Sequence, residues 1–188
     1  MTVTIAIALV LSFLFGGVDQ YLGSFSAHPW MADVSLLSAP WVVLPFLAGW
    51  TRRDSKRAIW VGLGCTFAAL AGYCLMTLSP IENAHFSLAG VVGFVRSDPP
   101  VFVGALVTGP LFGWLGFRWH RDRAWWAAVA VAGALCLEPL ARLVAGQAIR
   151  ASNVWIAEVA IGVAVALYFA YRSHASRRMA ADRTPPLP

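Results

Sequence analysis

Long apolar stretches alternate along this chain with short polar segments. An apolar run of about 20 residues is long enough to cross the hydrocarbon core of a bilayer as an α-helix. Six runs approach or reach this length: residues 3–21, 34–50, 58–79, 101–119, 124–145 and 154–171. The pattern therefore predicts an all-α fold, an integral membrane bundle of six transmembrane helices formed by residues 1–172.

Two local features modify this picture. The second run contains Pro40 and Pro45, which remove backbone donors and are expected to bend its helix. Between the third and fourth runs, residues 87–96 are apolar but too few to cross a bilayer, so we expect a short re-entrant or interfacial helix. Asp98 and the two prolines after it predict the N-cap and the first turn of the fourth transmembrane helix.

Composition excludes a soluble domain. Hydrophobic residues make up 59% of the chain and charged residues only 12%, and the mean hydropathy is +0.68. The formal net charge of +5 is dispersed in short clusters between apolar runs, which argues against a nucleic-acid partner and for the lipid bilayer. Most of the nine tryptophans fall near the ends of the runs, as in an interfacial aromatic belt.

The basic clusters predict an orientation. They follow the second, fourth and sixth runs: Arg52, Arg53, Lys56 and Arg57; Arg118, Arg121 and Arg123; Arg172, Arg177, Arg178 and Arg183. By the positive-inside rule these segments and both termini are cytoplasmic. The preference for arginine over lysine is typical of GC-rich bacterial genomes, so we expect a bacterial inner-membrane protein. Residues 173–188, which are polar and end in a proline-rich stretch, are expected to form a disordered cytoplasmic tail.

Two charges lie inside the fifth apolar run. Glu138 and Arg142 are four residues apart, so helical spacing places them on one face. An ionised group within a bilayer is costly and is usually paired or functional. This pair is therefore the strongest indication of a site in the sequence.

Other polar residues are expected at the same depth. With about 1.5 Å of rise per residue, Asp19, Tyr73 and Glu158 fall with the pair in the outer third of the membrane. The candidate ligand-binding residues are Asp19, Gln20, Tyr73, Thr77, Glu138, Arg142 and Glu158. Outer-loop residues expected to cover the site as a lid are His28, Glu82, His85, Arg96 and Arg150.

The charges of this layer do not balance. Three acids, Asp19, Glu138 and Glu158, face the single intramembrane cation Arg142. Either some acids are protonated because they are desolvated, or loop groups fold over the site, or a cationic ligand completes it. A purely structural interpretation is also open, in which Arg142 bridges to Glu138 or Glu158 and locks the last hairpin.

Several classes of chemistry find no support in the sequence. It contains no nucleotide-binding loop, dinucleotide fingerprint, nucleophile elbow or zinc-protease motif, and no cofactor is expected. The three cysteines lie within apolar runs, and the outer-loop histidines and acids have no ligand spacing, so no metal site is expected. Coupling to nucleotide hydrolysis would require a partner subunit.

Short segments resemble a known but uncharacterised family. Residues 17–24 (GVDQYLGS), 38–41 (SAPW), 49–50 (GW) and 71–73 (AGY) resemble a family of small bacterial multi-pass membrane proteins to which no activity is assigned. The chain is also similar in size and span count to the substrate-binding subunits of energy-coupling-factor vitamin transporters. It lacks their alanine signature in the first helix, so this likeness is one of architecture alone.

Three functions fit the sequence. The first is a binding or transport protein for a small polar or cationic solute, with a pocket in the outer half of the membrane. The second is an intramembrane enzyme that acts on a lipid or isoprenoid through a buried carboxylate. The third is a structural helper subunit of a larger membrane complex.

Overall fold

The computed structural model describes residues 2–25, 28–147 and 149–181, and the regular elements of these residues are all helices. In chain order they are α1 (Thr2–Gly23), α2 (Pro29–Ser35), α3 (Ala39–Trp50), α4 (Ser55–Thr77), the 3-10 turn η1 (Pro80–Glu82), α5 (Leu88–Ser97), α6 (Pro99–Asp122), α7 (Trp125–Val144) and α8 (Ser152–Ala181). Within this part of the chain, five helices are long and apolar enough to span a membrane, and α2 with α3 makes a bent sixth. The expected helical membrane bundle is confirmed.

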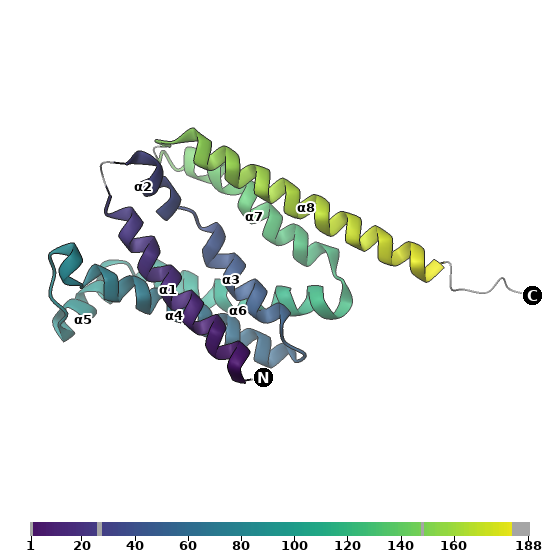
Figure 1. The fold of residues 1–188 in the computed structure, drawn as a ribbon, viewed down its shortest axis with the longest axis horizontal. Helices are drawn as coiled ribbons and strands as arrows, with labels where there is room; N and C mark the ends of the chain where they lie inside the picture. The colour runs from purple at the N-terminus through teal and green to yellow at the C-terminus, as the bar shows by residue number, and fades with distance from the viewer. Residues whose placement is uncertain (1, 26–27, 148, 182–188) are drawn as a thin grey trace, which may run out of the picture.

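The helices run back and forth between two ends of the bundle (Figure 1). The N-terminus and the α3–α4 and α6–α7 links lie at one end, here called the arginine-rich end because Arg52, Arg53 and Arg121 lie there. The α1–α2 link, α5 and the α7–α8 link lie at the other, here called the pocket end. Helix α1 packs on α4, α6 packs on α3 and α4, and α7 pairs with α8.

Glycines allow the central helices to approach backbone to backbone. A Cβ atom at Gly16 in α1 would overlap the carbonyl oxygen of Ala69 in α4, and one at Gly49 in α3 would overlap that of Gly113 in α6. Between helices surrounded by lipid, such close contact replaces the hydrophobic driving force that is missing there. The glycines therefore fix α1, α3, α4 and α6 as a tight frame.

Aromatic side chains fill the interior on the α7–α8 side. Trp119 is 1% exposed, and its ring packs edge-on against Phe169 at 4.4 Å between centroids. Phe46 of α3 joins the same cluster. Trp119 and Trp155 are thus buried within the protein, where the sequence led us to expect interfacial tryptophans, because their neighbours on adjacent helices enclose them.

The bend between α2 and α3 is 42° and comes at residues 36–38, just before Pro40. Pro40 occupies the first turn of α3, where a proline is tolerated, while Pro45 lies within the helix. In a continuous helix the amide of residue 40 would donate to the carbonyl of Leu36, but proline has no N–H and its ring would clash there. Pro40 therefore favours a break at this point, whereas Pro45, Pro110 and Pro139 lie within continuous helices.

Other boundaries are close to those expected. Asp98 is the N-cap residue of α6, but its side chain makes no capping hydrogen bond. The short helix expected over residues 87–96 is α5, with the side chain of Ser87 as its cap. Helix α8 continues to Ala181, so residues 173–181 of the expected tail are helical, and residues 182–188 lie outside the described part of the chain.

The helix contact at Gly16 generates the first prediction. Gly16→Ala forces α1 away from α4, and overpacking of this kind costs about 1–3 kcal/mol, so the unfolding temperature in detergent falls. Gly133→Ala is the matched control, because nothing lies within 4 Å of the added Cβ. This control is neutral or slightly stabilising, since alanine favours a helix over glycine by up to about 1 kcal/mol. Tryptophan fluorescence during heating measures both, and equal unfolding temperatures would contradict the proposed contact.

Candidate functional site

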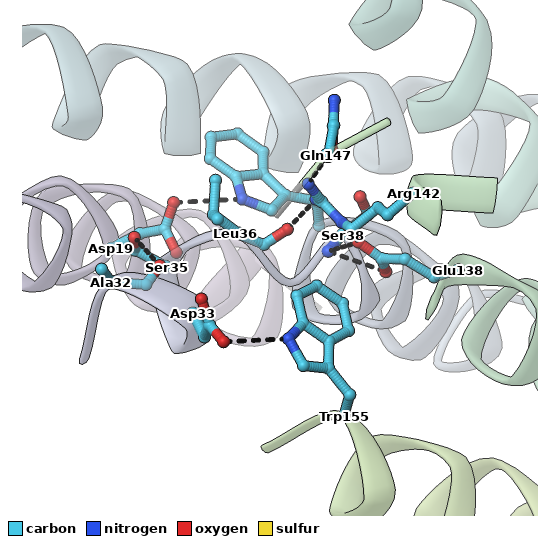
Figure 2. Close-up of polar contacts among 11 residues, drawn as sticks. Asp19, Ala32, Asp33, Ser35, Leu36, Ser38, Glu138, Arg142, Gln147 and Trp155 are labelled. Atoms are coloured by element: carbon cyan, nitrogen blue, oxygen red, sulfur yellow. Dashed lines mark hydrogen bonds and ion pairs between the residues drawn. The ribbon is translucent and has the colours of Figure 1, made fainter. Parts of the chain in front are cut away.

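The pair Glu138–Arg142 holds the broken ends of the second span (Figure 2). The guanidinium of Arg142 donates through Nη2 to the carbonyl oxygen of Leu36, the group that Pro40 leaves without a helical partner. Both carboxylate oxygens of Glu138 accept from the amide of Ser38, at 2.8 and 2.9 Å. One side-chain pair thus satisfies backbone groups on both sides of the break.

The two charges also suit the helix ends they contact. Arg142 donates from Nε and Nη2 to Oε1 of Glu138 at 3.1 and 2.9 Å. The cation lies at the C-terminal end of α2 and the carboxylate at the N-terminal end of α3, which are the favourable positions in each helix dipole. Arg142 also donates to Gln147 at 2.7 Å and lies 5.1 Å from the ring centre of Trp155.

Asp33 makes a second fastening between α2 and the α7–α8 hairpin. Its side chain is fully buried, and Oδ2 accepts from the backbone amides of Arg150 and Ala151 at 3.0 and 2.6 Å. The same oxygen accepts from the indole N–H of Trp155 at 3.0 Å. Asp33 therefore anchors the start of α8, while Trp155 contacts both this carboxylate and Arg142 (Figure 2).

A cavity of about 400 Å³, here called the Asp19 pocket, lies beside the break. It is lined by Asp19, Ser35, Leu36, Leu37, Ser38, Trp41, Val42, Thr66, Leu70, Tyr73, Phe94, Asp98, Val101, Phe102, Gly104, Ala105, Thr108 and Arg142. Asp19 is 5% exposed, and its one hydrogen bond among the described residues comes from the indole N–H of Trp41 at 3.3 Å. No described basic side chain forms an ion pair with it.

Aromatic rings form a continuous chain along this pocket. Trp41 and Tyr73 are 6.3 Å apart between centroids, Tyr73 and Phe94 are 6.0 Å apart, and Phe94 and Phe102 are 5.8 Å apart. The faces of such rings attract cations. The pocket therefore combines a buried carboxylate with an aromatic wall.

Glu158 lies on the other side of the break. It is 4% exposed, and neither carboxylate oxygen has a hydrogen-bond partner among the described residues. It is close enough to Glu138 and Arg142 to interact electrostatically with both. Its side chain lines a second cavity of about 590 Å³, here called the Glu158 groove, between α1, α2, α3, α7 and α8.

The residues expected to bind a ligand are thus divided between two cavities. Asp19, Tyr73 and Arg142 line the Asp19 pocket, Glu158 lines the Glu158 groove, and Glu138 lies at the break between them. Thr77 donates its hydroxyl to the carbonyl of Tyr73, an ordinary intrahelical bond. Neither Thr77 nor Gln20 is among the residues that line either cavity.

The expected lid residues lie at the pocket end. His28, His85, Arg96 and Arg150 are exposed. Glu82 accepts a hydrogen bond from the hydroxyl of Ser24, which ties η1 to the end of α1. None of these five side chains lines the Asp19 pocket in this structure.

Sequence reasoning did not select Asp33, Ser38, Trp41, Asp98 or Trp155 as site residues. Pro40 was the available signal for the break at Leu36 and Ser38, because a proline leaves the carbonyl four residues before it without a helical donor. Asp33 and Trp155 are 122 residues apart, and no local pattern brings them together. In the part of the chain that is described, no three His, Cys, Asp or Glu side chains are grouped closely enough to hold a metal ion.

The comparisons with known proteins identify the family. The model of DUF6518, a family of unknown function, matches residues 1–186, so the chain belongs to this family. This confirms the expectation of an uncharacterised family. No curated protein and no solved structure gives a significant match.

The clamp on the broken span generates the second prediction. Arg142→Met leaves a buried carboxylate without its cation and destabilises the fold by about 3–5 kcal/mol, whereas the added Glu138→Gln recovers part of that loss. The coupling energy from this double-mutant cycle falls within about 0.5–3 kcal/mol. Unfolding in a denaturing detergent provides the free energies.

The exposed pair Arg118–Asp122 is the control, because it has the same spacing and a distance of 2.8 Å with side chains 39% and 36% exposed. Its coupling energy, from Arg118→Met and Asp122→Asn, is expected at about 0.3–0.5 kcal/mol. A coupling at Glu138–Arg142 no larger than this would contradict the clamp.

Proposed function

We propose that this DUF6518 protein binds a small organic cation with an apolar or aromatic part in the Asp19 pocket, as a binding or transport protein of the bacterial inner membrane. The observation that carries the proposal is a carboxylate 5% exposed, facing a cavity, with no cation paired to it among the described residues. A buried charge is costly unless a partner compensates it. The proposed ligand supplies that partner.

The charge balance of the pocket favours a cation. Arg142 lines the pocket, but its guanidinium is occupied by Glu138, Leu36 and Gln147. The pair is therefore neutral overall, and Asp98 adds a second carboxylate to the pocket wall. This leaves a net negative site for a ligand that reaches Asp19.

The shape and walls favour an organic ligand over a bare metal ion. A volume of about 400 Å³ lies within the range of small-molecule sites. The ring faces of Trp41, Tyr73 and Phe94 supply cation–π attraction, worth about 0.5–2 kcal/mol depending on desolvation. Thr66 and Thr108 donate their hydroxyls to backbone carbonyls, which leaves the hydroxyl oxygens as acceptors for a ligand N–H.

The broken second span supports a role in movement of the ligand. Transporter sites are commonly built where a membrane helix is interrupted, because freed backbone groups and helix ends can then contact the ligand. Here Ser35, Leu36 and Ser38 from the break line the pocket. With the arginine-rich end in the cytoplasm, the pocket opens toward the opposite side of the membrane.

A thermal-shift titration with phenyltrimethylammonium tests the ligand class. This cation raises the unfolding temperature of the purified protein, and its uncharged isostere tert-butylbenzene does not. Asp19→Asn weakens binding of the cation about tenfold or more, since it removes the attraction between two opposite unit charges, which in a partly buried site exceeds the roughly 1.4 kcal/mol that corresponds to tenfold. Asp122→Asn, the same change at the arginine-rich end, binds like the wild type. Equal stabilisation by the uncharged compound, or unchanged binding by Asp19→Asn, would refute the proposal.

Reporter fusions test the orientation. Green fluorescent protein fused after Pro188 is expected to fluoresce, because it folds in the cytoplasm, and alkaline phosphatase fused after Asn83 is expected to be active, because it requires the oxidising side. The reverse pair, with alkaline phosphatase after Pro188 and green fluorescent protein after Asn83, should give neither signal. Activity of the reverse pair would place the pocket in the cytoplasm.

A further inference from the structure

The Glu158 groove is lined by residues of α1, α2, α3, α7 and α8 and of the break between α2 and α3. Its walls are almost wholly apolar and include Phe15, Leu37, Pro40, Leu44, Val154 and Ile161. Ile161 is 57% exposed, so the groove is open along the surface that faces lipid.

One acid lies in this apolar groove. Glu158 is six residues into α8, about 9 Å from its start, and only 4% of the residue is exposed. Both its carboxylate oxygens are without a hydrogen-bond partner among the described residues. Buried polar groups in proteins are rarely left unsatisfied, and each exception calls for a missing partner.

The N–H donors of the adjacent cluster that contact Glu138 do not reach Glu158 as hydrogen-bond donors. Glu138 accepts the hydrogen bonds of both Arg142 and the Ser38 amide, so these donors are already engaged. Glu138 itself adds a second carboxylate beside Glu158. Within the protein, the remaining way to satisfy Glu158 is a proton shared with Glu138. A positively charged donor in the groove would satisfy Glu158 and also offset the second carboxylate.

The groove is separate from the Asp19 pocket. Of the three residues in the break, Leu37 lines both cavities, whereas Leu36 and Ser38 line the Asp19 pocket alone. The segment that Glu138 and Arg142 hold in place is thus the wall between them. Occupation of the groove does not depend on the cation proposed for the Asp19 pocket.

We propose that the Glu158 groove binds a single-chain amphiphile from the bilayer whose head group carries a primary ammonium. The ammonium donates to Glu158, and the hydrocarbon chain lies along α3 between α1 and α8. The α8 wall is about 12 Å long from Asn153 to Ile161, and about 4.5 Å of it lies between Glu158 and Ile161, so the first carbons of the chain contact the groove and the rest extends into the bilayer. Three N–H donors and one charge match two unsatisfied oxygens beside a second carboxylate.

Photo-crosslinking in phosphatidylcholine nanodiscs tests this site. The probe is dodecylamine with a diazirine in its chain, and mass spectrometry maps the labelled residues. Labelling is expected on the groove walls, at Phe15, Leu44 or Ile161. Unlabelled dodecylamine competes with the probe, whereas dodecanol at the same bilayer concentration competes at least tenfold less well.

Two variants separate recognition of the head group from accommodation of the chain. Glu158→Gln removes the charge at nearly constant volume and is expected to lower labelling at least tenfold. Ile161→Trp fills the groove, leaves Glu158 in place and is expected to abolish labelling there. Asp19→Asn is the matched control, which labels like the wild type although it loses binding of phenyltrimethylammonium.

Three outcomes would overturn the proposal. They are labelling of the wild type outside the groove, equal competition by dodecanol and dodecylamine, and unchanged labelling of Glu158→Gln. The mapping on the wild-type protein decides the matter even where a variant fails to fold. Loss of cation binding in Asp19→Asn with groove labelling retained separates this site from the proposed function.

Discussion

The structure depends on one missing hydrogen-bond donor. Pro40 cannot donate to the carbonyl of Leu36, and a membrane protein has little water available to replace a lost backbone bond. Arg142 supplies the donor, and Glu138 both neutralises Arg142 and accepts from the Ser38 amide on the far side of the break. The hydrogen bonds to these backbone groups thus offset part of the desolvation cost of placing a charge pair in the membrane.

This arrangement leaves the other two acids without a cation. Arg142 is engaged by Glu138, Leu36 and Gln147. Asp19 and Glu158 lie on opposite sides of the break, each facing its own cavity. Their surroundings differ in chemistry. Asp19 faces aromatic rings and hydroxyls, which suits a small cation, while Glu158 lies among aliphatic side chains at a surface open to lipid.

The two ends of α3 have opposite roles. At the arginine-rich end, Gly49 lies against Gly113 of α6 so closely that no Cβ atom fits between them. At the pocket end, α2 and α3 meet at a 42° bend, and both cavities lie beside this bend. A rigid frame therefore supports an irregular segment, the usual condition under which non-helical backbone is tolerated at membrane depth.

The sequence by itself determined the spans and the short helix between the third and fourth of them, because hydropathy and run length follow directly from the order of residues. It also identified Glu138 and Arg142 as one unit through their spacing. Only the tertiary structure decided that the acids are divided between two cavities, and that Asp33, 122 residues from Trp155, anchors α8. The physical reason is that periodicity gives the depth and face of a residue on its own helix, whereas the rotation of each helix against its neighbours follows from glycine contacts and from the bend at Pro40.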